Sequence, residues 1–137
     1  MPAGDGPLIV LAEDSDFFRT MVRDILEDGG YRVRETRDGQ EALEAIRELR
    51  GEIALVVTDV EMPRLDGRGL SLALGKEFPG LPIVALTSLA SDEDERSLRE
   101  AGVDDYLVKL DREALLGSVA AIVAAVDKGP INNKEKS

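Results

Sequence analysis

The residues of this sequence that could do chemistry are three carboxylates, a hydroxyl and an amine, each at the end of a short apolar run. Carboxylates held close together repel one another and demand a cation, and a set of oxygen ligands favours Mg²⁺. A carboxylate beside Mg²⁺ can attack phosphorus, while a lysine and a hydroxyl hold the oxygens of the transferred phosphoryl group. The pattern therefore predicts phosphoryl transfer to an aspartate. In chain order the residues are Glu13, Asp14, Asp59, Thr87 and Lys109, with Asp59 as the central carboxylate.

Each of these residues alone has an ordinary structural role. An aspartate after a strand is most often a helix cap or a turn residue. Thr87 alone fits the end of a strand, Lys109 a solvated charge, and Tyr106 the core. Their order on four separate apolar runs is what favours one shared site.

The composition excludes several classes of protein. The sequence has no cysteine and no histidine, which rules out a disulfide scaffold, thiolate and histidine zinc sites, and cysteine or serine–histidine nucleophiles. Lys and Arg number 17 against 28 Asp and Glu, and the net charge of −11 argues against direct binding to nucleic acid. No apolar run approaches the length of a membrane span and no secretory signal is visible, so we expect a cytoplasmic protein without membrane contact.

Five short runs rich in Val, Ile and Leu alternate with five longer stretches of helical spacing. This alternation predicts an α/β fold, a doubly wound five-stranded parallel sheet with five helices, in which ligands bind beyond the carboxyl ends of the strands. Phe17, Met21, Ile25 and Leu26 form the apolar stripe of the first helix. We expect a linker or disordered N-terminus at 1–6, one domain at 7–126 and a disordered tail at 127–137. The predicted strands are 8–12, 31–35, 53–58, 83–87 and 106–108.

The sequence resembles a receiver domain, the phosphoacceptor module of two-component response regulators, over roughly 7–126. The resemblance implies a flavodoxin-like fold with strand order 2-1-3-4-5. It also implies a signalling switch that catalyses its own phosphorylation and slow dephosphorylation, and that is not a turnover enzyme. The segments that carry it are 12–15 (AEDS), 57–67 (VTDVEMPRLDG), 85–88 (ALTS), 101–106 (AGVDDY) and 108–109 (VK).

The resemblance also implies roles for single residues. Asp59 is the implied phosphorylation site, Thr87 and Lys109 the groups that hold the phosphoryl oxygens, and Tyr106 a switch that reshapes the surface of helix 4, strand 5 and helix 5. The implied cofactor is Mg²⁺, with Mn²⁺ as a substitute. The implied metal site comprises the side chains of Asp14 and Asp59, Glu13 through a water, and the backbone carbonyl of Glu61.

The implied partners are a histidine kinase or a histidine phosphotransfer domain and a downstream protein, with the receiver a monomer or weak dimer. Leu110 stands where the family usually has proline, which leaves open whether the preceding peptide is cis or trans. Residues 108–113 resemble receivers of chemotaxis-type histidine kinases. We expect Asp66 to be a turn or cap residue and Gly67 to need unusual backbone angles.

Three other functions remain open at this stage. An interaction-only receiver differs from a switch in showing no Mg²⁺-dependent phosphorylation. An aspartyl-phosphate hydrolase has a second aspartate where Glu61 stands. A flavin-binding module needs a phosphate loop where this chain has acidic residues, and a colourless protein excludes it.

Overall fold

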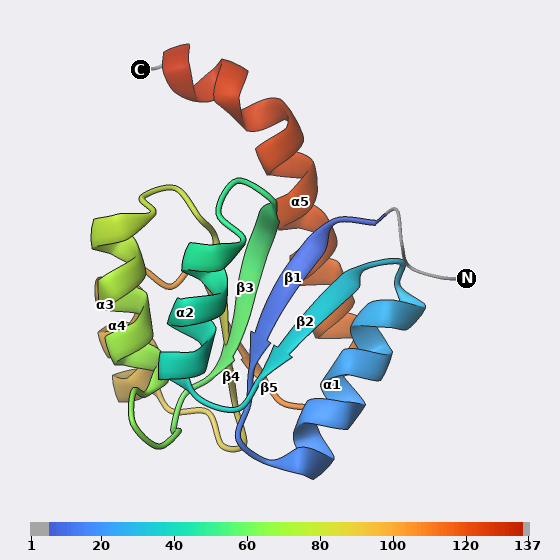
Figure 1. Ribbon diagram of the computed structural model, residues 1–137, viewed down its shortest axis with the longest axis vertical. Coiled ribbons are helices and arrows are strands. Elements are labelled where there is room, and N and C mark those ends of the chain that lie inside the picture. The colour runs from blue at the N-terminus through green and yellow to red at the C-terminus, as the bar shows by residue number, and fades with distance from the viewer. Residues whose placement is uncertain (1–5, 136–137) are drawn as a thin grey trace.

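Five parallel strands form one sheet in the order β2-β1-β3-β4-β5, which confirms the predicted fold and strand order. The computed structural model describes residues 6–135, with side chains described as far as residue 125. Figure 1 shows the sheet between two layers of helices. The strands are β1 (Leu8–Ala12), β2 (Arg32–Thr36), β3 (Ile53–Asp59), β4 (Ile83–Thr87) and β5 (Asp105–Val108). The helices are α1 (Asp16–Asp28), α2 (Gly39–Glu48), α3 (Gly67–Glu77), α4 (Asp92–Glu100) and α5 (Arg112–Glu135).

Alternate residues of β1 point to opposite faces of the sheet and enter two separate cores. Ile9 and Leu11 pack in the core with residues of α1 and α5, whereas Val10 and Ala12 pack in the core with residues of α2, α3 and α4. Because both faces of a parallel sheet are covered, its central strands consist of consecutive apolar residues. All five residues of β1 are buried.

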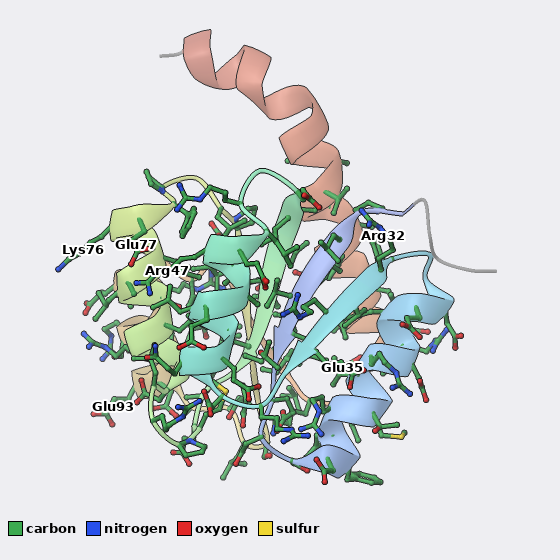
Figure 2. The ribbon with its side chains drawn as sticks, viewed as in Figure 1. Arg32, Glu35, Arg47, Lys76, Glu77 and Glu93 are labelled. Carbon is green, nitrogen blue, oxygen red and sulfur yellow. The ribbon has the colours of Figure 1, made fainter. Side chains whose placement is uncertain are left out.

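The edge strand β2 carries charged side chains, and charged side chains of neighbouring elements pair with them. Glu35 of β2 pairs with Arg23 of α1 at 3.2 Å between Oε2 and Nη1. Charged side chains on an edge strand discourage pairing with another chain. On the opposite side, Arg47 of α2 and Glu77 of α3 point toward each other (Figure 2) and form a two-pronged ion pair, with Nε 2.8 Å from Oε1.

The first turn of each of the four helices α1 to α4 is capped by a side-chain oxygen. In each case the cap accepts a hydrogen bond from the backbone N–H three residues on, which satisfies a donor that the helix leaves unpaired. The cap role expected for Asp66 is therefore confirmed. The four caps are Ser15, Asp38, Asp66 and Ser91.

The buried face of α1 differs from the predicted stripe. Val22, Ile25 and Leu26 are buried, but Phe17 is 62% and Met21 is 39% exposed. At 3.6 residues per turn, Phe17 and Leu26 point to opposite sides of the helix, so the four residues of the predicted stripe cannot share one face. The core therefore takes Val22 in place of Met21, and the first turn presents apolar side chains to solvent.

The last helix is longer than the sequence indicated. Helix α5 runs to Glu135 and projects past the sheet (Figure 1), into the segment 127–137 for which we predicted disorder. Alanine-rich sequence such as 120–125 favours continuation of the helix, although a proline inside a helix costs about 3 kcal/mol. Residues 1–5 and 136–137 of the predicted disordered ends lie outside the described residues. In the described part of the chain, no helix is both long and apolar enough to span a bilayer.

Candidate functional site

The carboxyl ends of the strands bring the predicted acidic residues together. Glu13 and Asp14 follow β1, and Asp59 is the last residue of the neighbouring β3. Carboxylate oxygens of the three lie within 4.8 Å of one another. From β1 the chain first adds a strand on one side (β2) and then continues on the other side (β3). Open α/β sheets bind ligands at this switch point between β1 and β3.

Lys109 bridges two of these carboxylates. Its Nζ lies 2.9 Å from Glu13 Oε1 and 3.3 Å from Asp59 Oδ1. The side chains of Lys109, Glu13 and Asp59 are only 7%, 1% and 9% exposed. Screening by water is weak at such sites, so the charges interact strongly.

The electrostatics of the site favour adding a cation. Burial and the negative charge of Glu13 together raise the pKa of the Asp59 carboxyl to about 6, despite the opposing effect of Lys109. Burial also acts to lower the pKa of Lys109, but the hydrogen bond to Glu13 and the charge of Asp59 outweigh it and raise that pKa. Once Asp59 is ionised, three carboxylates face one ammonium, and two negative charges remain uncompensated.

These residues fit a hard divalent cation. All three donors are carboxylates, and they leave the charge that one dication neutralises. Glu13 and Asp59 are buried while Asp14 is exposed, so one side of the group is open to the waters that Mg²⁺ retains. An adjoining cleft of about 430 Å³ is lined by Asp59, Val60, Glu61, Thr87, Ser88, Leu89, Ala90, Ser91, Asp94 and Lys109.

The loop after β3 is fixed tightly against Asp59. The N–H of Val60 donates to Asp59 Oδ1 at 2.8 Å. The prediction for Gly67 was wrong in its reason, because Gly67 has no positive φ; a Cβ there would lie 2.5 Å from the carbonyl oxygen of Asp59. The residue with unusual angles is Arg64, at φ 68. Its guanidinium binds Asp38, with Nε 3.0 Å from Oδ2, and so joins this loop to the start of α2.

Thr87 and Tyr106 both contact the loop between β4 and α4. The Thr87 hydroxyl donates to the carbonyl oxygen of Leu89 at 3.1 Å and accepts from the N–H of Leu89 at 3.3 Å. Tyr106 is 9% exposed, and its hydroxyl accepts from the N–H of Ser91 at 3.1 Å. Thr87 thus lines the cleft, and its hydroxyl is hydrogen-bonded to the backbone of the loop that follows it.

The peptide between Lys109 and Leu110 is trans. Leu110 has φ 66, a left-handed conformation that costs an ordinary side chain about 1–2 kcal/mol. Leu110 is 37% exposed. A proline could not adopt this angle, because its ring holds φ near −65°.

Sequence reasoning missed three contributors to the site. Phe18 lies over the ammonium group of Lys109, with 4.3 Å between Nζ and the ring centroid. The pair of Arg64 with Asp38 spans two loops. No spacing in the sequence pairs these residues; the only available signal was that Phe18 lies within five residues of Glu13, at the start of a capped helix.

The comparison with family models agrees with this geometry. The model described as the response regulator receiver domain matches residues 9–120. The chain belongs to the receiver domain family of two-component signalling. Receiver domains bind Mg²⁺ at an acidic pocket and interact with histidine kinases and downstream partners, and the acidic group here is Glu13, Asp14 and Asp59.

Individual relatives range from short regulators to long proteins. The gliding motility regulatory protein of Myxococcus xanthus is 38% identical over 111 residues, which are 79% of this chain and 14% of that protein. The polar-differentiation response regulator DivK of Brucella anthropi is 31% identical over 103 residues, 74% of this chain and 82% of DivK. The structure of the chemotaxis protein CheY4 of Vibrio cholerae matches with a TM-score of 0.79 at 29% identity, over 85% of this chain and 98% of CheY4.

Proposed function

We propose that the chain is a phosphoacceptor switch that takes a phosphoryl group from a phosphohistidine onto Asp59. The donor is a histidine kinase or a histidine phosphotransfer domain. The observation that carries the proposal is the convergence of Asp59 with two other carboxylates and Lys109 at one sheet edge. Family membership supports it.

The residues divide the work of the transfer. Asp59 supplies the nucleophilic oxygen, and the Val60 N–H and the Lys109 ammonium fix its Oδ1. Glu13 and Asp14, together with Asp59, would hold Mg²⁺, with the backbone carbonyl of Glu61 as a further ligand. When bound, Mg²⁺ neutralises charge on the carboxylates and on the phosphoryl oxygens. Mn²⁺ offers the same preference for oxygen ligands.

The transfer balances without any further reagent. The phosphorus–nitrogen bond of the phosphohistidine breaks, a phosphorus–oxygen bond to the Asp59 carboxylate forms, and the released imidazole keeps the electron pair and takes a proton from solvent. Lys109 holds one oxygen of the incoming group. Slow hydrolysis later returns inorganic phosphate and the free carboxylate, so the chain catalyses reactions on itself and turns over no separate substrate.

The response of the surface starts at Thr87. To reach a phosphoryl oxygen, its hydroxyl has to leave the backbone groups of Leu89. The same loop carries the Ser91 N–H that binds the Tyr106 hydroxyl, so movement of Thr87 is passed to Tyr106 and to the surface of α4, β5 and α5. This surface is where we propose that the downstream protein binds.

Apolar side chains beside the site support a protein donor. Phe17 and Met21 of α1 are exposed, and so is Leu110, which follows Lys109. Exposed apolar groups next to a reactive site are typical of protein contacts. We propose that the phosphohistidine-bearing protein docks there.

We also propose a narrower relationship. Residues 108–113 resemble receivers of chemotaxis-type histidine kinases, and two relatives are a chemotaxis protein and a gliding motility regulator. The match covers only 14% of the gliding motility regulator, so in that relative the matching receiver is one segment of a longer protein.

The test is intact-mass spectrometry after incubation with Mg²⁺ and acetyl phosphate. We expect the wild type to gain one phosphoryl mass, and the gain to vanish with EDTA and in Asp59→Asn. Asp66→Asn is the matched control, because Asp66 lies in the same loop and asparagine keeps its capping bond. Binding of beryllofluoride with Mg²⁺ checks the pocket without the chemistry. Absence of both adducts contradicts the proposal and leaves an interaction-only receiver.

A further inference from the structure

The aromatic ring of Phe18 lies over the ammonium group of Lys109. The Nζ atom is 4.3 Å from the ring centroid, within the ~6 Å over which a cation is attracted to the face of an aromatic ring. Because the Lys109 side chain is 7% exposed, little water competes with this contact. The ring therefore contributes to the position of a charged group at the centre of the site.

Lys109 has two kinds of partner. The first kind is the carboxylate: Nζ lies 2.9 Å from Glu13 Oε1 and 3.3 Å from Asp59 Oδ1, and both groups carry negative charge when ionised. An ammonium has three N–H donors, and two carboxylates do not exhaust them. Phe18 is the third partner and the uncharged one.

These partners differ in how they respond to a dication. A cation bound among Glu13, Asp14 and Asp59 neutralises the carboxylates and weakens their attraction for a nearby ammonium. The quadrupole of an aromatic ring does not change with the charge of the carboxylates. We infer that Phe18 is a positioning residue that keeps the Lys109 ammonium in the site when the carboxylates are neutralised. The inference rests on the proposed function, in which Lys109 holds a phosphoryl oxygen.

The fold fixes Phe18 firmly enough for this role. Its N–H donates to the Oγ of the cap residue Ser15 at 3.2 Å, and the Ser15 N–H donates to Glu13 Oε2 at 3.1 Å. The ring packs edge-on against Phe17, with centroids 5.3 Å apart and planes at 72°. Glu13 in turn binds Lys109. Phe18, Ser15, Glu13 and Lys109 are therefore linked in a ring of contacts.

The first measurement is an NMR spectrum of the metal-free full chain. The ring current of Phe18 should move the ε-methylene proton resonances of Lys109 upfield in the wild type and in Phe18→Tyr, and the displacement should disappear in Phe18→Leu. Phe78→Leu is the matched control, because it removes a ring that lies over a different cation, Arg50, with 5.4 Å between the guanidinium carbon and the ring centroid. Identical Lys109 resonances in the wild type and Phe18→Leu would overturn the inference.

The second measurement is the rate constant for phosphorylation by acetyl phosphate at saturating Mg²⁺. Phe18→Leu should be slower by about two- to thirtyfold, the range that a cation–π contact supports. Phe18→Tyr and Phe78→Leu should stay close to the wild type. Calorimetry should give the same Mg²⁺ affinity for all, since neither position offers a ligand. Equal losses in Phe18→Leu and Phe18→Tyr, or a loss that follows weaker Mg²⁺ binding, would refute the role.

The two proposals fail in different ways. A wild type that never gains a phosphoryl group refutes the proposed function, and this inference with it. A phosphorylated wild type whose rate Phe18→Leu leaves unchanged refutes the inference alone. Phe18 is only partly buried, so leucine keeps an apolar contact there, and urea unfolding verifies that each variant is folded.

Discussion

Replacing Asp59 by asparagine should stabilise the metal-free protein at neutral pH. The pKa of Asp59 rises from 3.8 to about 6 because the carboxyl is buried and faces Glu13, despite the opposing charge of Lys109. The folded protein therefore disfavours the ionised carboxylate. Asparagine has nearly the same shape as the neutral acid and carries no charge. The variant thus removes the cost of ionising Asp59 in the folded state.

The size of the effect follows from the pKa. One pKa unit corresponds to about 1.36 kcal/mol, so a rise from 3.8 to about 6 costs the folded state at most about 3 kcal/mol. Some solvent still reaches the side chain, which is 9% exposed, and we therefore expect Asp59→Asn to raise the free energy of unfolding by about 1–3 kcal/mol at pH 7.

The dependence on pH has a definite sign. Between pH 3.8 and about 6 the folded state binds more protons than the unfolded state, so this contribution to stability is present below pH 3.8 and is lost as the pH rises through about 6. The advantage of Asp59→Asn over the wild type should grow across the same window.

Urea unfolding followed by far-UV circular dichroism in EDTA, at a series of pH values, measures this. Asp66→Asn is the control and should show no gain, because that carboxylate caps α3 in an exposed loop. Mg²⁺ should then stabilise the wild type more than Asp59→Asn, since a ligand bound to the folded state alone stabilises it. If Asp59→Asn is less stable than the wild type at pH 7 in EDTA, the electrostatic account of the site is wrong.

Three further substitutions test the loops around the site by urea unfolding. Burial acts to raise the pKa of Asp38, but the hydrogen bonds from the Glu41 N–H and from Arg64 outweigh it and lower that pKa. Asp38→Ala should therefore cost about 1–2 kcal/mol of stability at neutral pH. This cost should shrink as the pH falls through the lowered pKa, and a cost that stays constant with pH would contradict the prediction. Leu110→Gly should be more stable than Leu110→Ala by about 1 kcal/mol, because glycine adopts φ 66 without penalty and alanine does not; equal stabilities of the two variants would show that the angle is unstrained. Gly67→Ala should destabilise by about 1–3 kcal/mol, because its Cβ meets a backbone carbonyl 2.5 Å away; a neutral result would show that the loop can move.

The fold and the central residues of the site could be predicted because they depend on short-range patterns. Buried parallel strands read as apolar runs, and their carboxyl ends meet at one sheet edge, so Glu13, Asp59 and Lys109 had to lie close together. The cap Asp66 followed from residue type and position alone.

The parts that could not be predicted depend on contacts between side chains far apart in sequence. The pairs Arg64 with Asp38 and Phe18 with Lys109 join elements whose relative rotation no local pattern determines. The prediction of the buried face of α1 was wrong for a related reason. Residues four apart look aligned in a sequence, but the packed helix rotates Met21 out of the core.

The hydrogen bonds of the β4–α4 loop set the background activity of the proposed switch. The resting arrangement is held by two hydrogen bonds between the Thr87 hydroxyl and the Leu89 backbone and by one from the Ser91 N–H to the Tyr106 hydroxyl. Each contributes about 1 kcal/mol, so releasing all three costs about 3 kcal/mol. At that cost about 0.6% of resting molecules hold the other arrangement at any moment. For the proposed switch we therefore expect a small background output, above which an incoming signal can raise the active fraction by no more than about 160-fold.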